Sequence, residues 1–243
     1  RSGRCTELEA LPCLRQLDGS LIMGSDLIAV ARRCGLVGAI GERLIDAVCR
    51  QLGAWRERGE QLFPVALAVA SEQLRQPQRL VEIVIKSLHE NDLAAELLAL
   101  EVCDFSLAHD SVQAGAALRE LDALGVRVVA AAFGAAGGTL TRLVHLPLRG
   151  VALDESLLVD SNEPRARTLL RSLVSMGHGL QCSVLAKGVT TQEQLECLLE
   201  SAADYYQGGL LSGPLPADEV EQFLMQHHRV AFVAHVGQVR SAG

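Results

Sequence analysis

The sequence predicts an α/β fold, a (β/α)8 TIM-like barrel built around one parallel sheet. Short apolar segments alternate with helical segments from about residue 65 to residue 226, and no block holds strands alone or helices alone. The largely apolar stretch Val126–Phe133 is typical of a strand that is buried on both faces in a parallel sheet. The 243 residues suit one such barrel, which is the most economical closure of repeated right-handed crossovers.

The first third of the chain is less regular. Residues 1–9 suggest a strand or the end of a hairpin, and Asp18-Gly19 indicates a turn. Ser25 is placed to cap a helix over about 26–34 that stops at Gly35. A second helix over about 41–58 has one apolar face, and we expect Trp55 on that face to belong to the core.

The repeating part gives six strands and the helices between them. We expect the strands at residues 65–70, 97–103, 126–132, 151–153 and 180–185, and a last strand or strand-like turn at 205–211. We expect the helices to begin at Pro77 and to cover about 110–124, 139–145, 164–176, 191–200 and 216–226. Thr191 caps its helix, with Gln194 at the capping-box position. An open doubly wound sheet is the alternative, but no GxGxxG follows an early strand.

Composition narrows the class of protein. The net charge of -7 and the lack of a lysine or arginine cluster argue against nucleic acid as a partner, because binding phosphates needs a basic face. No apolar run approaches the ~20 residues that cross a bilayer. The seven cysteines form no CxxC pair and mostly lie in apolar segments, so we expect them to be reduced and buried in a cytoplasmic protein.

The ends of the chain suggest a fragment with a short extension. The sequence begins at Arg1 without methionine, and we expect it to be cut from a longer protein. We assign residues 1–226 to the barrel domain. Residues 227–243 mix apolar and polar residues and are expected to be a C-terminal extension or linker.

The carboxyl ends of barrel strands meet at one rim, where functional groups are placed. The residues expected at these ends are Glu9, Ala68, Glu101, Ala131 with Ala132, Ala152 with Asp154, Lys187 and Gln207. Carboxylates alone would suit a hard divalent cation. A lysine at the same rim offers the other interpretation, in which the Lys187 ammonium neutralises Glu9 and Glu101.

Each of these residues also has a purely structural interpretation. Glu9 fits an exposed strand end equally well, whereas Glu101 follows Leu97–Leu100 and is expected to be partly buried with a partner. Asp154 is also suited to capping the segment after it. Gln207 is compatible with a simple turn, and Lys187 with a solvated loop.

Several ordered motifs resemble the EAL-domain family of cyclic-di-GMP phosphodiesterases. They are Glu9-Ala10-Leu11, Leu98–Asp104, Phe133-Gly134, Ala186–Leu195, Asp204–Gly208 and Ser212–Pro216. They keep the family's order and spacing over almost the whole chain. The resemblance implies a modified (β/α)8 barrel whose first strand would precede Arg1. It also implies attack on a phosphodiester by water that two divalent ions activate.

Most of the family's reactive groups are replaced in this sequence. Glu9 and Glu101 match metal-binding glutamates, and Asp154 and Gln207 match family positions. The resemblance implies that alanines stand where the family has its metal-binding asparagine (Ala68), its paired aspartates (Ala131 and Ala132) and its lysine (Ala152). In the family's EGVE-like turn, Lys187 stands in place of the glutamate and Thr190 in place of the second acid. Cys13 stands in place of the phosphate-binding arginine, and Leu14 in place of an aromatic residue. Because several such losses coincide, we expect no catalytic residue, no Mg or Mn, and no turnover.

The resemblance leaves two main functions open. One is a receptor module that binds cyclic-di-GMP without cutting it and signals through a protein partner or a flanking domain; the other is an adaptor that has lost the nucleotide too. The candidate ligand-binding residues are Glu9, Leu11, Arg15, Glu101, Asp154, Lys187, Gln207 and Pro214. With the family arginine absent, Arg15, Lys187 or Arg127 would have to meet the ligand phosphates. A weak enzyme is a third possibility, and the family suggests a homodimer.

Overall fold

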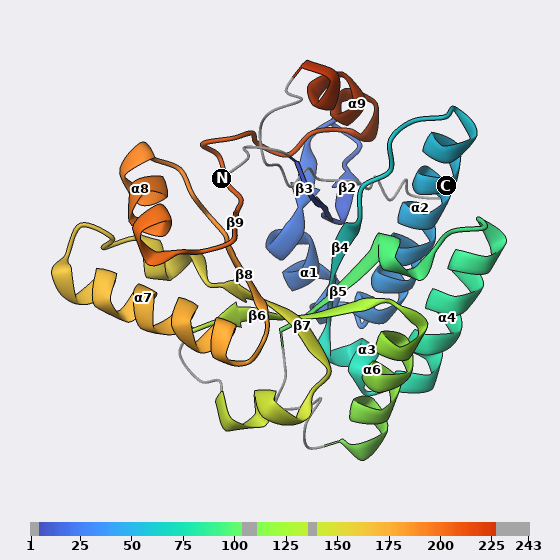
Figure 1. Ribbon diagram of the computed structural model, residues 1–243. Helices are drawn as coiled ribbons and strands as arrows, with labels where there is room; N and C mark the ends of the chain where they lie inside the picture. Colours follow the sequence, from blue (N-terminus) through green and yellow to red (C-terminus); the bar gives the residue numbers. More distant parts are fainter. Residues whose placement is uncertain (1–4, 104–110, 136–139, 227–243) are drawn as a thin grey trace.

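A computed structural model describes residues 5–103, 111–135 and 140–226 (Figure 1). Its centre is a curled parallel sheet of seven strands, in the order β1-β4-β5-β6-β7-β8-β9. The strands are β1 (Leu8–Ala10), β4 (Val65–Val69), β5 (Leu98–Val102), β6 (Arg127–Phe133), β7 (Leu148–Leu153), β8 (Ser183–Ala186) and β9 (Tyr205–Tyr206). The predicted parallel α/β barrel architecture is therefore confirmed.

Helices surround this sheet, and α1 packs against α2 and the β2–β3 segment (residues 13–23) (Figure 1). They are α1 (Gly24–Arg33), α2 (Val37–Glu57), α3 (Ser71–Leu74), α4 (Pro77–Glu90), α6 (Val112–Leu124), α7 (Pro164–Gly179), α8 (Gln192–Ser201) and α9 (Ala217–Gln226). The described residues also include the short 3-10 helices η1 (Ala95–Leu97), η2 (Leu140–His145) and η3 (Glu155–Leu158). Pro77 begins α4 as predicted, and the Thr191 hydroxyl caps α8 with Gln194 completing the capping box.

The two faces of the sheet carry side chains of different size. Branched residues on the outer face, such as Leu67, Leu100 and Val128, join the large hydrophobic core beneath the helices. A separate cluster on the inner face consists of Ala66, Ala99, Val129 and Ala152, packed against Leu185. Because side chains alternate along a strand, the alanines mark the positions that point into the barrel. Glu9 and Glu101 belong to this inward set, since they pair in register with Ala66 and Ala68.

Several boundaries differ from the sequence-based expectation. The cap of α1 is Met23 rather than Ser25, and no side chain caps that end. Helix α2 begins at Val37, four residues early, and α7 runs through Gly177 to Gly179. Strand β7 starts at Leu148 rather than Val151, and β9 stops at Tyr206 rather than at 211. Tertiary contacts extend or shorten each element beyond what local signals specify.

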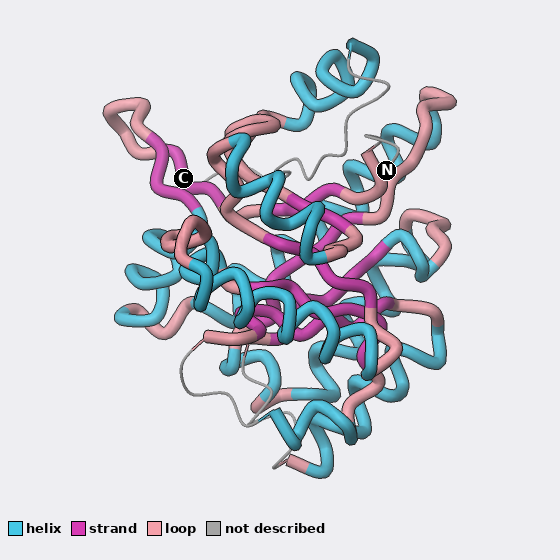
Figure 2. The backbone as a smooth tube through the Cα atoms, turned by 60° about the vertical axis from the view of Figure 1, so that its left-hand side comes forward, coloured by secondary structure: helices cyan, strands magenta, loops and turns pink. Residues whose placement is uncertain are grey.

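The largest element that the sequence did not predict is an antiparallel hairpin, formed by β2 (Cys13–Arg15) and β3 (Leu21–Met23). It stands out from the rest of the chain, and the expected Asp18-Gly19 turn lies at its tip (Figure 2). Its strands have only three residues each, too few to show a clear alternation in the sequence. The hairpin carries Arg15, one of the candidate phosphate contacts.

The molecular surface agrees only in part with the expectations from composition. Four cysteines are buried, but Cys34 and Cys103 are exposed, so the expectation that cysteines are interior residues is wrong for these two.

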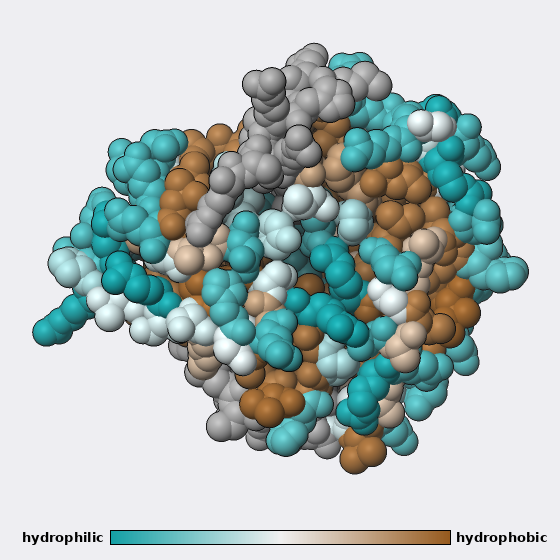
Figure 3. All heavy atoms as spheres, viewed as in Figure 1, coloured by the Kyte–Doolittle hydropathy of each residue, from teal (hydrophilic) through white to brown (hydrophobic). Residues whose placement is uncertain are grey.

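Trp55 is buried as predicted, and Glu221 of α9 accepts the hydrogen bond of its indole N–H. Within the described ranges, no helix has the length and apolarity to cross a membrane. Hydrophilic side chains dominate the face in Figure 3, while hydrophobic ones gather on the side of α2 and α4.

The predictions that involve residues 1–4, Asp104, the first residues of the helices expected at 110 and 139, and the extension 227–243 lie outside the described residues.

Candidate functional site

Three charged side chains meet at the carboxyl ends of β1, β5 and β8. The Lys187 Nζ lies 3.0 Å from Glu9 Oε1 and 2.5 Å from Glu101 Oε2. The three side chains are 22%, 9% and 3% exposed in the order Lys187, Glu9, Glu101. The structure thus brings together the lysine and the two glutamates that the sequence placed at one rim.

The charges of this cluster are strongly coupled. Burial raises the pKa of Glu101 to about 7, and the nearby Glu9 charge adds to this effect while Lys187 opposes it. Burial by itself lowers the pKa of Lys187, but the carboxylates of Glu101 and Glu9 outweigh it and raise that pKa above its ordinary value. Lys187 therefore stays protonated, and one ammonium faces two carboxylates.

Gln207 completes the cluster from the end of β9. Its Nε2 donates a hydrogen bond of 2.5 Å to Glu9 Oε2. Its Oε1 is buried and has no hydrogen-bond partner within the part of the chain that the structure describes. A buried acceptor of this kind requires a donor from a water or a ligand. Gln207 is therefore more than the turn residue that the sequence also permitted.

A two-metal centre does not fit the residues around this cluster. Ala68, Ala131, Ala132 and Ala152 at the rim carry methyl groups, and Asp154 Oδ1 is engaged by the Ser156 amide and hydroxyl. A methyl group supplies no oxygen ligand, and hard divalent cations favour several oxygens. The Lys187 ammonium also occupies the space between the two carboxylates that a bridging cation would use. A second positive charge there would be repelled in a partly desolvated site.

A tight turn holds Lys187 and Gln207 at the same level of the barrel. The Val189 amide donates to the Gln207 carbonyl at 2.9 Å, and the Leu210 amide donates to the Val189 carbonyl at 2.9 Å. Gly208 has φ +151°, and a Cβ there would lie 2.2 Å from the Val189 carbonyl oxygen. Only glycine permits this close approach of two backbones. The Lys187-Gly188 and Gln207-Gly208 motifs therefore position the rim cluster.

Ala132 at the end of β6 adopts a left-handed conformation, with φ 53°. It sits at a rim position, and its carbonyl accepts a hydrogen bond from the Ala135 amide at 3.1 Å. Alanine in this region costs on the order of 1–2 kcal/mol, because Cβ approaches the backbone closely. The strained conformation at this rim position is therefore adopted by a residue whose side chain is a methyl group.

The other site residues predicted from the sequence are spread over several elements. Asp154 Oδ1 caps η3 by accepting from the Ser156 amide at 3.0 Å and from the Ser156 hydroxyl at 2.5 Å, which is its structural interpretation. Leu11 is half-buried, Pro214 is exposed, and Arg15 is exposed on the β2–β3 hairpin. The structure does not bring these residues into contact with the lysine cluster, and their role in binding stays a prediction.

Arg127 corrects one expectation. It is the first residue of β6, so it lies at the amino end of the sheet, opposite the rim. Its guanidinium forms an ion pair with Glu7, which immediately precedes β1. Arg127 is therefore not placed to meet a ligand phosphate at the rim. The sequence signal for this ion pair was the charge of Arg127 within an otherwise apolar strand, because a buried charge needs a partner.

The sequence pattern of the EAL domain family matches residues 1–214. The chain belongs to the EAL domain family. Within this EAL domain, Glu9 stands at the glutamate of the Glu9-Ala10-Leu11 triplet, and the computed fold agrees with the solved members.

Two curated relatives illustrate the family. The signaling protein YkoW of Bacillus subtilis is 30% identical over 224 residues, which are 92% of this chain and 28% of that protein. The cyclic di-GMP phosphodiesterase NbdA of Pseudomonas aeruginosa is 30% identical over 223 residues, 91% of this chain and 28% of that protein. The EAL domain therefore spans less than a third of either relative.

Solved structures show the same architecture. The MucR phosphodiesterase of Pseudomonas aeruginosa, in a complex with c-di-GMP, superposes with a TM-score of 0.77 at 26% identity and covers 85% of this chain and 83% of that chain. The FimX EAL domain of Pseudomonas aeruginosa bound to c-di-GMP gives 0.72 at 20% identity, covering 82% of this chain and 79% of that one. The second likeness concerns the fold alone.

Proposed function

We propose that this EAL domain is a non-catalytic regulatory module that binds cyclic-di-GMP at its rim without hydrolysing it and signals through a protein partner. The observation that carries the proposal is the position of Lys187, whose Nζ lies within 3.0 Å of both Glu9 and Glu101. An ammonium here replaces the positive charge that metal ions supply to a phosphodiesterase, but it generates no hydroxide nucleophile.

Two features support retained nucleotide binding. Gln207 Oε1 is a buried acceptor awaiting a donor, such as an N–H or hydroxyl of a ligand. Arg15, exposed on the hairpin that follows β1, supplies a guanidinium of the kind that binds phosphate. The MucR complex with c-di-GMP, which superposes over most of the chain, provides the ligand class.

Calorimetry with cyclic-di-GMP in the presence of EDTA tests the proposal. We expect a dissociation constant in the micromolar range or tighter, weakened by about tenfold or more in Gln207→Ala and Arg15→Ala, since each removes a polar contact. Arg79→Ala, on the outer helix α4, is the matched control and leaves binding unchanged. Absence of heat at high ligand concentration contradicts the receptor function.

Hydrolysis is tested separately. We expect no linear dinucleotide product after incubation with cyclic-di-GMP and magnesium or manganese, because two carboxylates and an ammonium provide no metal-bound water. Formation of product that stops in Glu101→Gln would contradict the non-catalytic assignment.

The second candidate function is an adaptor that binds protein partners only. It is favoured by Cys13, a buried thiol at the position the family uses for a phosphate-binding arginine. It is also favoured by the engagement of Lys187 with two carboxylates, which reduces its charge toward a phosphate. The calorimetric experiment separates the two functions. A protein partner, a homodimer and a cytoplasmic location are part of the same proposal.

A further inference from the structure

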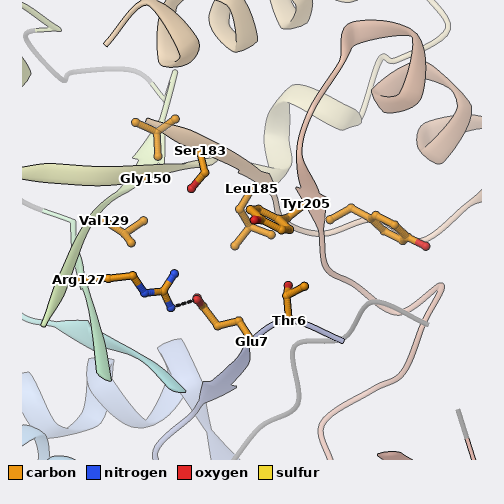
Figure 4. A pocket seen from close by; sticks show the side chains of 10 residues that line it. Thr6, Glu7, Arg127, Val129, Gly150, Ser183, Leu185 and Tyr205 are labelled. Carbon is orange, nitrogen blue, oxygen red and sulfur yellow. Dashed lines mark hydrogen bonds and ion pairs between the residues drawn. The ribbon is translucent and has the colours of Figure 1, made fainter. Parts of the chain in front are cut away.

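The orientation of Lys187 is only partly fixed by its strand. Side chains alternate along β8, and Ser183 and Leu185 both point to the inner side of the curled sheet (Figure 4). Lys187 continues this inward set, but β8 ends one residue earlier, at Ala186. The turn of residues 187–191 that follows the strand therefore decides where the Lys187 ammonium lies.

The side-chain amide of Gln194 holds this turn from the side of α8. Its Oε1 accepts hydrogen bonds from the Thr190 amide at 2.8 Å, the Thr191 amide at 3.1 Å and the Thr190 hydroxyl at 3.1 Å. A capping box needs only the bond to the Thr191 amide. The two bonds to Thr190 reach one residue further back toward Lys187, so they hold the turn and not the helix.

The other end of the same amide holds η3. Gln194 Nε2 donates to the Leu158 carbonyl at 3.2 Å, and Leu158 is the last residue of η3. The turn is also pressed against η3 directly, because a Cβ at Gly188 would lie 2.4 Å from Glu155 Cβ. Gln194 therefore joins the turn after β8 to the segment after β7 at the place where the two pack most closely.

Helix capping alone does not require this side chain. Glutamate serves the third helical position of a capping box as well as glutamine does, and its charge is favourable at a helix amino terminus. A carboxylate has no N–H, however, and cannot donate to the Leu158 carbonyl. Only an amide accepts from the turn and donates to η3 with one group.

We propose that Gln194 is a positioning residue for the rim, which sets the Lys187 ammonium between Glu9 and Glu101 by fixing the turn 187–191 against η3. It acts through Thr190 and Leu158 and not on a ligand. Its consequence for cyclic-di-GMP rests on the proposed function, whereas its effect on Lys187 can be measured without any ligand.

Lysine labelling of the whole chain tests the proposal. Lys86 and Lys187 are the only lysines of the sequence, and Lys86 is exposed on α4, which makes it an internal reference. Trace acetic anhydride at pH 8 acetylates unprotonated amines, and peptide mass spectrometry gives the rate at each lysine. We expect Lys187 to react at least about tenfold more slowly than Lys86, because it is buried and held protonated by two carboxylates.

Gln194→Leu keeps the volume of the side chain and removes its hydrogen bonds. We expect the Lys187 rate to rise about fivefold or more, the equivalent of one lost hydrogen bond, while the Lys86 rate stays the same. Gln194→Glu retains the cap and loses the donor to Leu158, so the Lys187 rate should rise while the melting temperature stays close to that of the wild type. Labelling that changes without stability is a result that a helix cap does not produce.

Thr191→Ala is the matched control, since it removes the capping hydroxyl and keeps the bonds of Gln194 to Thr190 and Leu158. Its Lys187 rate is expected to equal that of the wild type despite its lower stability. An unchanged Lys187 rate in Gln194→Leu, or an equal rise in Thr191→Ala, overturns the proposal.

Calorimetry with cyclic-di-GMP separates this inference from the proposed function. We expect Gln194→Leu to bind about threefold or more weakly than the wild type, because the misplaced ammonium no longer balances the two carboxylates. A wild type that binds no cyclic-di-GMP contradicts the receptor function, and the labelling rates still decide the role of Gln194. A wild type that binds, together with a Gln194→Leu variant of equal affinity, contradicts the positioning role.

Discussion

Lys187 determines the electrostatic character of the rim. It is held between two carboxylates that are almost fully buried, and a buried charge is tolerated only with a partner. The Lys187 ammonium therefore supplies the positive charge that the two buried carboxylates need. It thus stabilises both buried acids.

Removal of the Lys187 charge is expected to destabilise the fold. In Lys187→Met, Glu9 and Glu101 keep their burial and lose the ammonium, a change that typically costs about 3–5 kcal/mol of unfolding free energy. Urea unfolding at pH 8 measures the loss. Lys86→Met, on an exposed position of α4, is the matched control and is expected to change stability by less than about 0.5 kcal/mol. A Lys187→Met variant as stable as the control would show that the cluster is unimportant for folding.

The turns that follow β8 and β9 act as one element. Val189 bonds to Gln207 and Leu210 through the backbone, so the lysine and the glutamine are fixed relative to each other before any side chain is considered. Gly208 is the position at which the two backbones approach most closely. Glycine is required there by geometry and not by general loop flexibility.

Gly208→Ala is expected to cost about 3 kcal/mol or more, because the new methyl group overlaps the Val189 backbone at a strained φ. The adjacent Gly209→Ala is the matched control, since the nearest atom to its Cβ would be Thr190 Cγ2 at 3.8 Å. Thermal unfolding followed by circular dichroism compares the two. Similar melting temperatures would contradict the close approach.

The capping box of α8 makes a smaller, local contribution. The Thr191 hydroxyl accepts from the Gln194 amide at 3.3 Å, and Gln194 Oε1 accepts from the Thr191 amide at 3.1 Å. We expect Thr191→Ala to lower the unfolding free energy by about 1 kcal/mol, and Thr191→Ser to retain most of it. Chemical denaturation of the two variants checks this, and equal losses would exclude a capping role for the hydroxyl.

The whole barrel contains charge at both ends of an apolar interior. Lys187, Glu9 and Glu101 lie at the rim, Arg127 and Glu7 lie at the floor, and alanines separate them. Burial raises the pKa of Glu101 to about 7 and also raises that of Glu7. Carboxyls with raised pKa values bind protons more tightly in the folded chain than in the unfolded chain. Their contribution to the unfolding free energy therefore decreases as pH rises.

The unfolding free energy is therefore expected to fall as pH rises between about 4.5 and 7. In this window the folded state holds a proton on Glu101 that the unfolded state has released, and above pH 7 that contribution is lost. The difference from 4.5 to about 7 corresponds to at most about 3 kcal/mol. Glu101→Gln should reduce the slope, leaving the part due to Glu7, while Glu82→Gln on exposed α4 should not. An unchanged slope in Glu101→Gln would contradict the raised pKa.

Much of the fold was predictable from the sequence because its signals are local. Pro77 at the start of α4, the Thr191 cap and Gly125 at the end of α6 act within a few residues, and the apolar strands follow directly from their composition. The short β2–β3 hairpin was missed for the same reason, since three-residue strands carry too little pattern. The ordered motifs were enough to identify the EAL resemblance.

The sequence by itself determined the alternation of strands and helices, the family, and the list of groups present or absent at the rim, because each follows from residue type and spacing along the chain. Only the tertiary structure decided which groups meet. Lys187 meets Glu101 across 86 residues of sequence and Gln207 meets Glu9 across 198, and Arg127 proved to face Glu7 at the floor. The curl and register of the sheet set these distances, and no local pattern contains them.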